Sequence, residues 1–542
     1  MSFHHISIWR RSPNKLRQND AWLECFCVFG LTLAVLMLFL VNLTYLPLLD
    51  PQEGILALLA KELYQPITSN NVFSAASEQL NFWQSPLTYN LVALSYHIAG
   101  VNELTTRLPG ALLGGISVLL LYYVGREIFV ARIPALFSAI VYLTCLPVVR
   151  YSRLASLNGP LLCFELLTIW AILRSRRNLQ WALVVGIGFS LMSLTQGLFA
   201  LQILVIILLF ILWDTPRLLT SAYFWGGATI GALPSFCWYL VIFVHSRNWS
   251  HNLNIRDLWL GSSAFAGAES ILFTNSYLDL IHFTPYFLPW LFVMLAGTKS
   301  IQHNFQWGWG KLLAVWLAGY LTLGLIMLPQ DYWLILPLSP PLALAAGKQL
   351  EQIYQGPDDQ RYPRIWIYSF VLMSVFAALA AINWGVRNYI DFYLPFICSF
   401  LSITFAVTAI VIAQQDRQFI PLLFWGLFVS IFWLVISPHW IWELQGTEPV
   451  KPIAEMIKLH TEPEAIIYSG MSRKRPSLEF YSDRLVINQS IDQLEEHWQQ
   501  DLDVCLLVDL ATLKQLKLPQ QALIKDQRFD SLRWVLAIKH HP

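Results

Sequence analysis

Charged residues are sparse in this chain, and one group of them has the composition of a chemical site. The group combines four carboxylates with three arginines, all beside apolar segments: Asp50, Glu53, Glu62, Glu103, Arg107, Arg150 and Arg153. A carboxylate can take the proton from a reacting hydroxyl group, and arginines can hold a phosphate group as it leaves. The sequence therefore offers an acid and a cationic phosphate grip, provided that the fold brings these residues together.

The composition indicates that transmembrane helices must bring these residues together. The chain has 542 residues, of which 56% are hydrophobic and only 13% are charged, whereas a soluble protein averages about 25% charged residues. Apolar stretches at residues 25–48 and 392–413 reach the roughly 20 residues needed to cross a bilayer. The first stretch is expected to remain as a helix, because it has full spanning length and no small-residue cleavage site of a signal peptide follows it.

Hydropathy predicts an α-helical polytopic membrane protein with about thirteen transmembrane helices. The expected spans are 25–48, 105–125, 133–149, 158–174, 180–196, 198–213, 219–244, 281–298, 311–328, 332–348, 365–385, 392–413 and 419–437. A cytoplasmic N-terminus places lysine and arginine in cytoplasmic loops by about two to one, as the positive-inside rule requires. The C-terminus is then extracytoplasmic, and the expected membrane is the plasma (inner) membrane.

The chain is expected to have two domains. Residues 1–437 form the transmembrane domain, with external loops near 49–106 and 245–280. Residues 86–99 of the first loop are apolar but short for a span, which favours an interfacial helix. Residues 438–542 have a globular composition with apolar runs between charged segments, which predicts a small extracytoplasmic α/β domain.

Charge and cysteine content argue against several classes of partner. The formal net charge is only +1 and no basic block is present, so nucleic acid is not an expected partner. The seven cysteines form neither close clusters nor evident pairs, which gives no sign of a metal site or a disulfide framework. No cofactor is identified, and a divalent metal is left open without a carboxylate cluster to support it.

Several motifs resemble a known family. They are LLDPQEGILALLAKELY at 48–64, NFWQSPLTYNLVALSYHIAG at 81–100, NELTTRLPGALLGG at 102–115, YSRLASLNGPLL at 151–162, GFSLMSLTQG at 188–197, FLPW at 287–290, MLPQDYWLILPLSPPLALAAG at 327–347 and PSLEFYSDR at 476–484. Their order is similar to that of the GT-C membrane glycosyltransferases, in particular the bacterial aminoarabinose transferase and protein O-mannosyltransferase group.

The resemblance implies a GT-C-like fold and an enzyme of the cell envelope. Such enzymes take a sugar from a polyprenyl-phosphate carrier at the external membrane face. They move it to a lipid, protein or glycan acceptor. Membrane lipids are the remaining expected partners.

The chain departs from the family pattern at five charged positions. Gln52 and Asn158 stand where the pattern has aspartates, and Gln84, Gln196 and Met327 stand where it has lysines. A glutamine amide cannot act as a general base near neutral pH, so the activity of the chain is left open.

The remaining charges define the predicted site. The predicted catalytic carboxylates are Glu53, which matches a family position, and Asp50, which lies two residues from the lost aspartate. The predicted substrate-binding residues are Gln52, Gln84, Arg107, Arg150, Arg153, Asn158 and Gln196.

Structural and functional alternatives stay open. Glu53 and Asp50 can instead cap the helix expected near residue 55, and Arg107 can extend from a helix end toward lipid headgroups. The alternative function is a catalytically inactive GT-C-like protein that binds lipid-linked glycan or scaffolds envelope assembly. A transporter is weaker, because no inverted repeat is visible.

Overall fold

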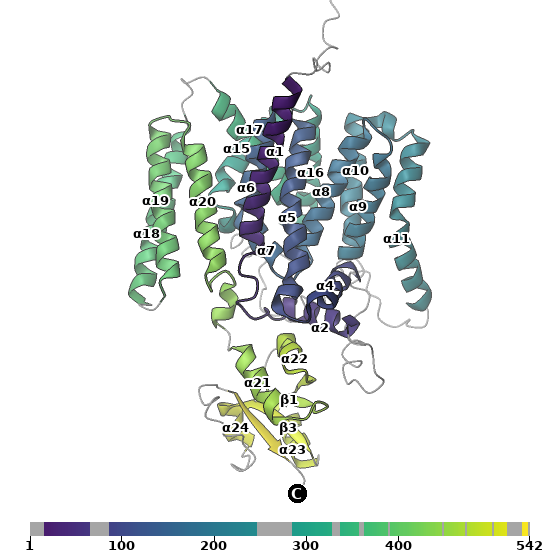
Figure 1. The fold of residues 1–542 in the computed structure, drawn as a ribbon, viewed down its shortest axis with the longest axis vertical. Helices are drawn as coiled ribbons and strands as arrows, with labels where there is room; N and C mark the ends of the chain where they lie inside the picture. Colours follow the sequence, from purple (N-terminus) through teal and green to yellow (C-terminus); the bar gives the residue numbers. More distant parts are fainter. Residues whose placement is uncertain are drawn as a thin grey trace, which may run out of the picture.

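The computed structural model describes most of the chain. The described residues are 16–64, 86–129, 131–246, 284–327, 336–356, 362–387, 391–446, 449–471, 474–500, 503–516 and 534–539. They form a bundle of long helices, with a smaller region of helices and strands beyond one end of it (Figure 1). That end is called the domain end below.

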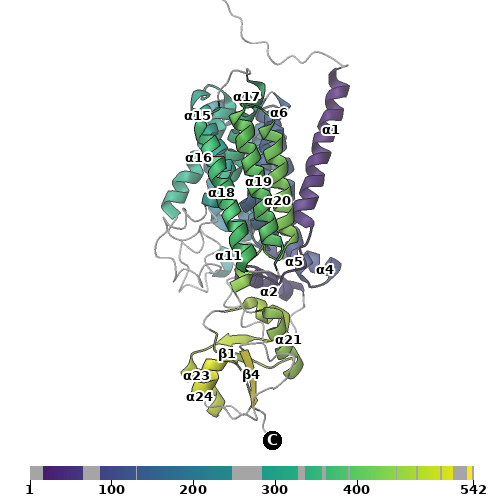
Figure 2. The same ribbon diagram turned by 90° about the vertical axis from the view of Figure 1, so that its left-hand side faces the viewer.

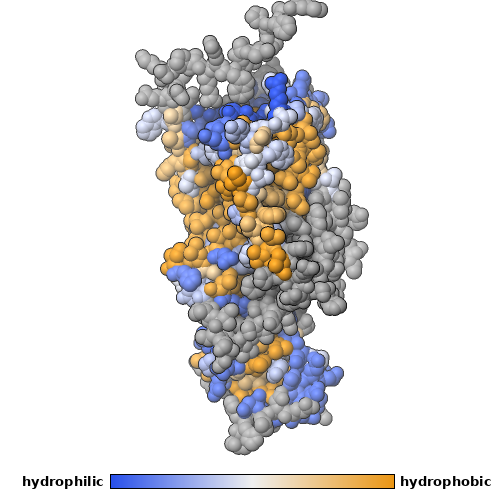
Figure 3. All heavy atoms as spheres, turned by 90° about the vertical axis from the view of Figure 1, so that its right-hand side faces the viewer, coloured by the Kyte–Doolittle hydropathy of each residue, from blue (hydrophilic) through white to orange (hydrophobic). Residues whose placement is uncertain are grey.

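The bundle consists of apolar helices running between its two ends. The helices are α1 (Leu16–Val35), α5 (Glu103–Ile128), α6 (Arg132–Leu143), α7 (Leu146–Arg153), α8 (Asn158–Ser175), α9 (Trp181–Gln196), α10 (Leu201–Asp214), α11 (Ala222–Ser246), α15 (Trp290–His303), α16 (Gly308–Met327), α17 (Ser339–Gln355), α18 (Arg364–Arg387), α19 (Tyr393–Ala413) and α20 (Phe419–Ile436). Helices suit a bilayer because each satisfies its own backbone hydrogen bonds. Figure 3 shows a broad apolar band across one face of the bundle, with hydrophilic residues above it.

These helices overlap the expected apolar segments with bounds displaced by several residues, and the predicted count of about thirteen spans stays a prediction. Among the described residues, five helices are long and apolar enough to cross a membrane, or six if the bent pair α6 and α7 forms one span. Several of the others, such as α9 and α10, are shorter. The chain is an integral, multi-pass helical membrane protein.

The first helix ends earlier than expected. It continues from α1 as a π-helix, Leu36–Leu40, and stops there instead of reaching residue 48. The chain leaves the helix at Val41, which is extended, and turns at Asn42, which adopts the left-handed conformation with φ of 59° that asparagine tolerates better than most residues. Its side-chain amide donates to the carbonyl groups of Val435 and Ile436 at the end of α20.

Two short helices lie across the domain end of the bundle (Figure 2). They are α2 (Gln52–Tyr64) and α4 (Pro86–Ala99). The bounds of α4 match the helix expected within the first loop. Buried faces of both helices pack together around Leu56, Val92 and Tyr96, so the two helices form a platform between the bundle and the C-terminal region.

The C-terminal region is built on a four-stranded sheet with the order β2-β1-β3-β4. Its elements are α21 (Val450–His460), β1 (Ile467–Ser469), α22 (Pro476–Ser482), β2 (Val486–Asn488), α23 (Ile491–Gln500), β3 (Val504–Asp509), α24 (Leu510–Leu516) and β4 (Trp534–Lys539). Strand β1 runs parallel to β2 and β3, whereas β4 is antiparallel to β3. The exact domain boundary at residue 437 stays a prediction.

Candidate functional site

The predicted acid Glu53 and the predicted cation Arg107 form a buried ion pair at the domain end. Arg107 donates from Nε to Glu53 Oε1 at 2.9 Å and from Nη2 to Oε2 at 2.6 Å. Both side chains are 0% exposed. Glu53 also accepts from the backbone N–H groups of Leu49 and Ala155, at 2.8 and 2.7 Å. Because Glu53 is fully buried and both of its carboxylate oxygens are occupied, this geometry favours a structural role for Glu53.

Arg107 also holds the chain segment that follows the first helix. Its Nη1 donates to the carbonyl groups of Leu43 and Leu46, and its Nη2 donates to that of Pro47, each at 2.8 Å. Carbonyl groups beyond a helix end have no partner within the helix. Arg107 therefore fixes the approach to α2, and no part of its side chain reaches the surface of the described structure.

Arg153 also binds backbone carbonyl groups near the end of the first helix. Its Nη1 donates to the Leu38 carbonyl at 2.7 Å, and its Nη2 donates to the Val41 carbonyl at 2.8 Å. The Trp440 ring lies between the two arginines, with its centroid 4.6 Å from Arg153 Cζ and 5.2 Å from Arg107 Cζ. Cation–π contacts of this kind stabilise buried guanidinium groups. Arg107 and Arg153, which the sequence predicted to bind phosphate, are therefore both held inside the protein.

Arg150 lies closer to the surface. It pairs with the Glu443 carboxylate, and its Cζ lies 3.5 Å from the centroid of the Trp442 ring. The Glu443 side chain is 42% exposed, so Arg150 is the predicted cation whose carboxylate partner is most open to solvent. Trp440, Trp442 and Glu443 were not identified from the sequence, because nothing near residue 440 matches a motif.

Asp50 joins the bundle to the C-terminal region. Its Oδ1 accepts from the Ser477 backbone N–H at 2.7 Å, and its Oδ2 accepts from the Ser477 hydroxyl group and, at 3.4 Å, from Arg475 Nε. Asp50 therefore caps the start of α22 from another part of the chain. Burial raises the pKa of the Asp50 carboxyl, although the bonds from Ser477 and the charge of Arg475 oppose this shift.

Further polar contacts hold α22 against the platform. Lys61 pairs with Asp483 and donates to the Phe480 carbonyl at 2.9 Å. Tyr481 accepts from the Leu48 N–H and donates to Glu103, both at 3.0 Å. Phe480, Tyr481 and Asp483 belong to the segment PSLEFYSDR. The motif therefore marked the region of contact, but it did not indicate the partners of these residues.

Two carboxyl groups at this junction, those of Glu62 and Glu479, have raised pKa values. Burial raises the pKa of Glu62 to about 7. The pKa of Glu479 is also raised to about 7, mainly by burial, and the charges of Glu62 and Asp50 add to this shift. Proximity of like charges disfavours ionisation, so the α2–α22 junction changes charge near neutral pH.

The neutral positions of the family pattern also gather at the domain end. Gln52 begins α2, Asn158 begins α8, and Gln196 ends α9. The bond from Ala155 N–H to Glu53 links the starts of α2 and α8. Gly159 tightens this arrangement, since a Cβ atom there would lie 2.3 Å from the Gly110 carbonyl oxygen of α5. Gln84 and the Met327 side chain lie outside the described residues.

Gln196 is the most deeply placed of these amides. It is 1% exposed, and its Oε1 has no hydrogen-bond partner in the described part of the chain. Thr88 at the start of α4 is 2% exposed, and its hydroxyl is likewise unpartnered there. Tyr239 of α11 donates to the Ser193 carbonyl, one helical turn before Gln196.

Metal binding finds no support in the side chains that are described. Those residues contain no group of three or more His, Cys, Asp and Glu side chains able to hold an ion. Near α22, Asp483 instead pairs with Lys61 and Lys458, and Asp50 pairs with Arg475 and accepts from Ser477.

Comparison with known proteins shows that the chain is similar to membrane sugar transferases. The Dolichyl-phosphate-mannose-protein mannosyltransferase family matches residues 84–240. An uncharacterized protein of Aquifex aeolicus (strain VF5) is 21% identical over 464 residues, which cover 84% of this chain and 87% of that protein. Undecaprenyl phosphate-alpha-4-amino-4-deoxy-L-arabinose arabinosyl transferase 1 of Pseudomonas fluorescens is 25% identical over 297 residues, and the match spans 50% of each chain.

A solved structure shares the fold. ArnT from Cupriavidus metallidurans, bound to undecaprenyl phosphate, aligns with a TM-score of 0.66 over 96% of this chain and 98% of that one, at 16% identity. Its apo state aligns with a TM-score of 0.68. With the family match, these findings confirm the resemblance drawn from the sequence motifs.

Proposed function

We propose that this chain, a member of the GT-C membrane glycosyltransferase superfamily of the aminoarabinose transferase and protein O-mannosyltransferase type, moves a sugar from a polyprenyl-phosphate-linked donor to a lipid, protein or glycan acceptor. The comparisons support glycosyltransferase function in general. The donor carrier, the acceptor class and the membrane face are the proposal. The inactive alternative is not favoured, because the relatives with named activities are transferases.

The proposal rests on the convergence of several helix starts at the domain end of the bundle. The starts of α2 and α8 and the first turns of α5 meet there around the Glu53–Arg107 pair. Gln52 and Asn158 occupy the helix starts at which the family pattern carries aspartates. This convergence supports a site of the family type, with amides in place of two acids.

The reaction needs a proton acceptor. The acceptor oxygen forms a bond to the anomeric carbon, the bond from that carbon to the phosphate oxygen breaks, and polyprenyl phosphate leaves with the electron pair. The hydroxyl proton passes to a base. Asp50 suits this role better than Glu53, because its side chain is 17% exposed, whereas that of Glu53 is 0% exposed, and its raised pKa brings it closer to the working range of a base.

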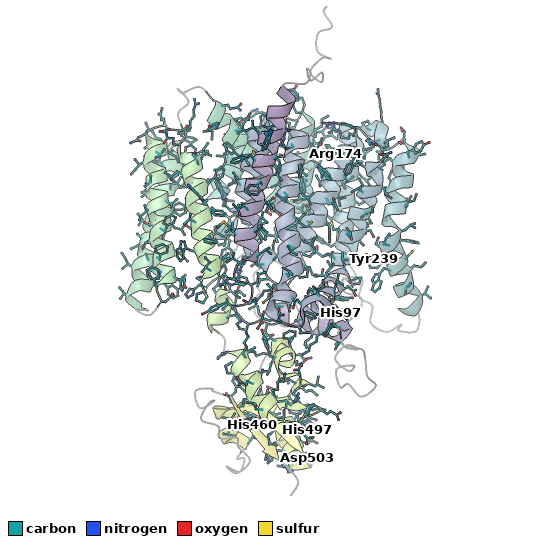
Figure 4. The ribbon with its side chains drawn as sticks, viewed as in Figure 1. His97, Arg174, Tyr239, His460, His497 and Asp503 are labelled. Atoms are coloured by element: carbon teal, nitrogen blue, oxygen red, sulfur yellow. The ribbon has the colours of Figure 1, made fainter. Side chains whose placement is uncertain are left out.

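Sidedness follows from the distribution of ion pairs. Arginines gather at the bundle end opposite the C-terminal region, where Arg126 and Arg132 pair with Glu24, and Arg174 pairs with Glu127. Arg174 lies at that end in Figure 4, far from His97 of α4. The positive-inside rule makes that end cytoplasmic. The proposed site then faces the extracytoplasmic side of the plasma (inner) membrane.

A pair of variants tests the proposal. Purified chain is supplied with undecaprenyl-phosphate sugars and an envelope extract as the source of acceptors, and release of undecaprenyl phosphate is measured. Asp50→Asn should lower the rate by about a hundredfold or more, the scale of lost acid–base catalysis. Ser477→Ala is the matched control, because it removes one partner of Asp50 but keeps the carboxylate.

The two variants separate catalysis from docking. Retention of most of the rate in Ser477→Ala, with loss in Asp50→Asn, supports Asp50 as the base. Equal losses in both would assign Asp50 to docking alone. Absence of release by the wild-type chain from every donor would refute the transferase proposal.

A further inference from the structure

We infer that the protein binds the headgroup of an anionic phospholipid at the bundle end opposite the C-terminal region. The site is called the Arg174 cluster below and consists of Glu127 at the end of α5, Trp170, Arg174 and Arg177 at the end of α8, and Trp181 at the start of α9. Arg174 lies far from His97 of α4, at the other end of the bundle (Figure 4). The inference is therefore independent of the proposed sugar transfer.

The carboxylate of this cluster lies inside and its cations lie outside. Glu127 pairs with Arg174 Nε at 2.8 Å and with Arg177 Nη1 at 3.2 Å. The Glu127 side chain is 10% exposed, whereas those of Arg174 and Arg177 are 40% and 59% exposed. One carboxylate can neutralise only one of two guanidinium groups. The pair of arginines therefore presents an excess positive charge on the outer side of the cluster.

Two indole rings hold Arg174 in place. Its Cζ lies 5.1 Å from the centroid of Trp170 and 5.5 Å from that of Trp181, and the two rings meet edge to face at 4.8 Å. Cation–π contacts of this kind fix the orientation of a guanidinium group. Tryptophan side chains favour the boundary between membrane and water. The cluster is thus suited to the level at which lipid phosphates lie.

A second cluster of the same composition adjoins the first. Asp214 at the end of α10 pairs with Arg176 Nη2 at 2.7 Å and with Lys311 Nζ at 3.4 Å. The Asp214 side chain is 8% exposed. Arg176 lies between Arg174 and Arg177 in the sequence, so two excess charges meet at the turn between α8 and α9. Hydrophilic residues gather directly above the apolar band on the side of the bundle where α11 lies (Figure 3).

Side chains at this end that the structure does not describe add to the positive charge. They belong to residues 1–20, to residue 130 and to residues 357–361, which join α17 to α18. Their basic residues outnumber their acidic ones, with Arg10, Arg11, Lys15, Arg17 and Arg361 against Asp20, Asp358 and Asp359. The excess charge at this end therefore does not depend on where these side chains are placed.

A phospholipid matches both parts of the cluster. Arginine binds a phosphate group through two parallel N–H bonds, and basic pockets between membrane helices bind anionic lipid headgroups. The indole rings offer apolar surface to the part of the lipid next to its phosphate. A bound headgroup would join the ends of α5 and α8, which pack against each other. The same two helices carry Arg107 and Asn158 near their other ends, so the lipid would brace the helices that form the domain end.

Native mass spectrometry of the purified full-length chain tests the site. The chain is titrated in detergent with phosphatidylglycerol or with phosphatidylethanolamine of the same acyl chains, and the bound fractions give the affinities. We expect phosphatidylglycerol to bind more tightly. Arg177→Gln should lower its affinity about fivefold, the scale for one basic residue near a membrane surface, and Arg174→Gln combined with Arg177→Gln should lower it further. Arg177→Lys should keep most of the affinity, because it keeps the charge.

Arg364→Gln is the matched control. Arg364 is also exposed and begins α18, which stands on the opposite side of the bundle from α9 (Figure 1). Equal losses in Arg364→Gln and Arg177→Gln would assign the binding to general surface charge and overturn the site. Equal affinity for the two lipids would overturn it as well. Displacement of phosphatidylglycerol by an equal concentration of inorganic phosphate would make the cluster a site for a free anion. Arg177→Gln decides the outcome even if the double variant fails to fold, because an exposed ion pair contributes little to stability.

Discussion

Replacing Glu53 with glutamine tests whether the buried pair is structural or catalytic. The change keeps the size of the side chain and removes its charge, so Arg107 is left as an unpaired cation at 0% exposure. Removing one partner of a buried ion pair typically costs about 3–5 kcal/mol. Three of the five bonds from Arg107 go to carbonyl groups and persist in the variant, so we expect a loss near 3 kcal/mol, about a 150-fold shift in the unfolding equilibrium.

The assay is equilibrium unfolding of the purified chain in mixed detergent, followed by tryptophan fluorescence. Lys458→Met is the control, because Lys458 is 55% exposed and pairs with a partly exposed Asp483. Such surface pairs contribute about 0–1 kcal/mol. The structural interpretation predicts that Glu53→Gln unfolds far more easily than Lys458→Met. A variant that unfolds like the wild type and yet loses sugar transfer would refute that interpretation and return Glu53 to the catalytic role.

Three further predictions concern the junction and the arginine near the surface. The pKa values of Glu62 and Glu479, raised to about 7 from 4.5, mean that docking of α22 is favoured by protonation; this contribution is complete below about pH 4.5 and lost as pH rises through about 7. Protease resistance of the C-terminal region should therefore fall between about pH 5 and 8, and Glu62→Gln with Glu479→Gln should flatten the profile. Tyr481→Phe removes bonds to Leu48 and Glu103 and should destabilise docking by about 1–3 kcal/mol; unchanged proteolysis would contradict this. Glu443→Gln frees the charge of Arg150 and should tighten binding of undecaprenyl phosphate at low salt, whereas unchanged affinity would remove Arg150 from the carrier site.

Sequence reasoning predicted a helical membrane protein and the short helix at 86–99, because long apolar runs leave few alternatives in a membrane. It could not show that Arg107 binds Glu53, since 54 residues separate them and only the fold makes them neighbours. The same limit applies to Trp440, whose packing between two arginines depends on the end of α20. The first helix stops at Leu40 because the backbone becomes extended at Val41 and left-handed at Asn42, which apolar composition does not reveal.

The predicted site divides into two physical classes. Positions that carry charge in this chain, such as Glu53 and Arg107, are deeply buried and hold backbone groups. Positions that are neutral in this chain, such as Gln52 and Asn158, begin helices, and both helices form with amides there. Neutral substitutions there leave the fold intact. A shared fold is thus expected whether or not transfer is retained, which is why the variants of Asp50 carry the decision about activity.

Gly54 offers a way to disturb Asp50 without changing its charge. A Cβ atom at Gly54 would lie 2.6 Å from the Ser477 backbone nitrogen and 2.8 Å from Asp50 Oδ1. No rotamer relieves this approach, because the nearer atom belongs to the backbone, so Gly54→Ala must push α22 away from α2. If docking positions Asp50 for catalysis, Gly54→Ala loses transfer and protease resistance together, while Gly100→Ala, with no atom within 4 Å of its Cβ but a positive φ of 77°, shows the effect of backbone strain alone. Full transfer by Gly54→Ala with an undocked C-terminal region would show that Asp50 works without Ser477, and the C-terminal region would then lie outside the catalytic apparatus.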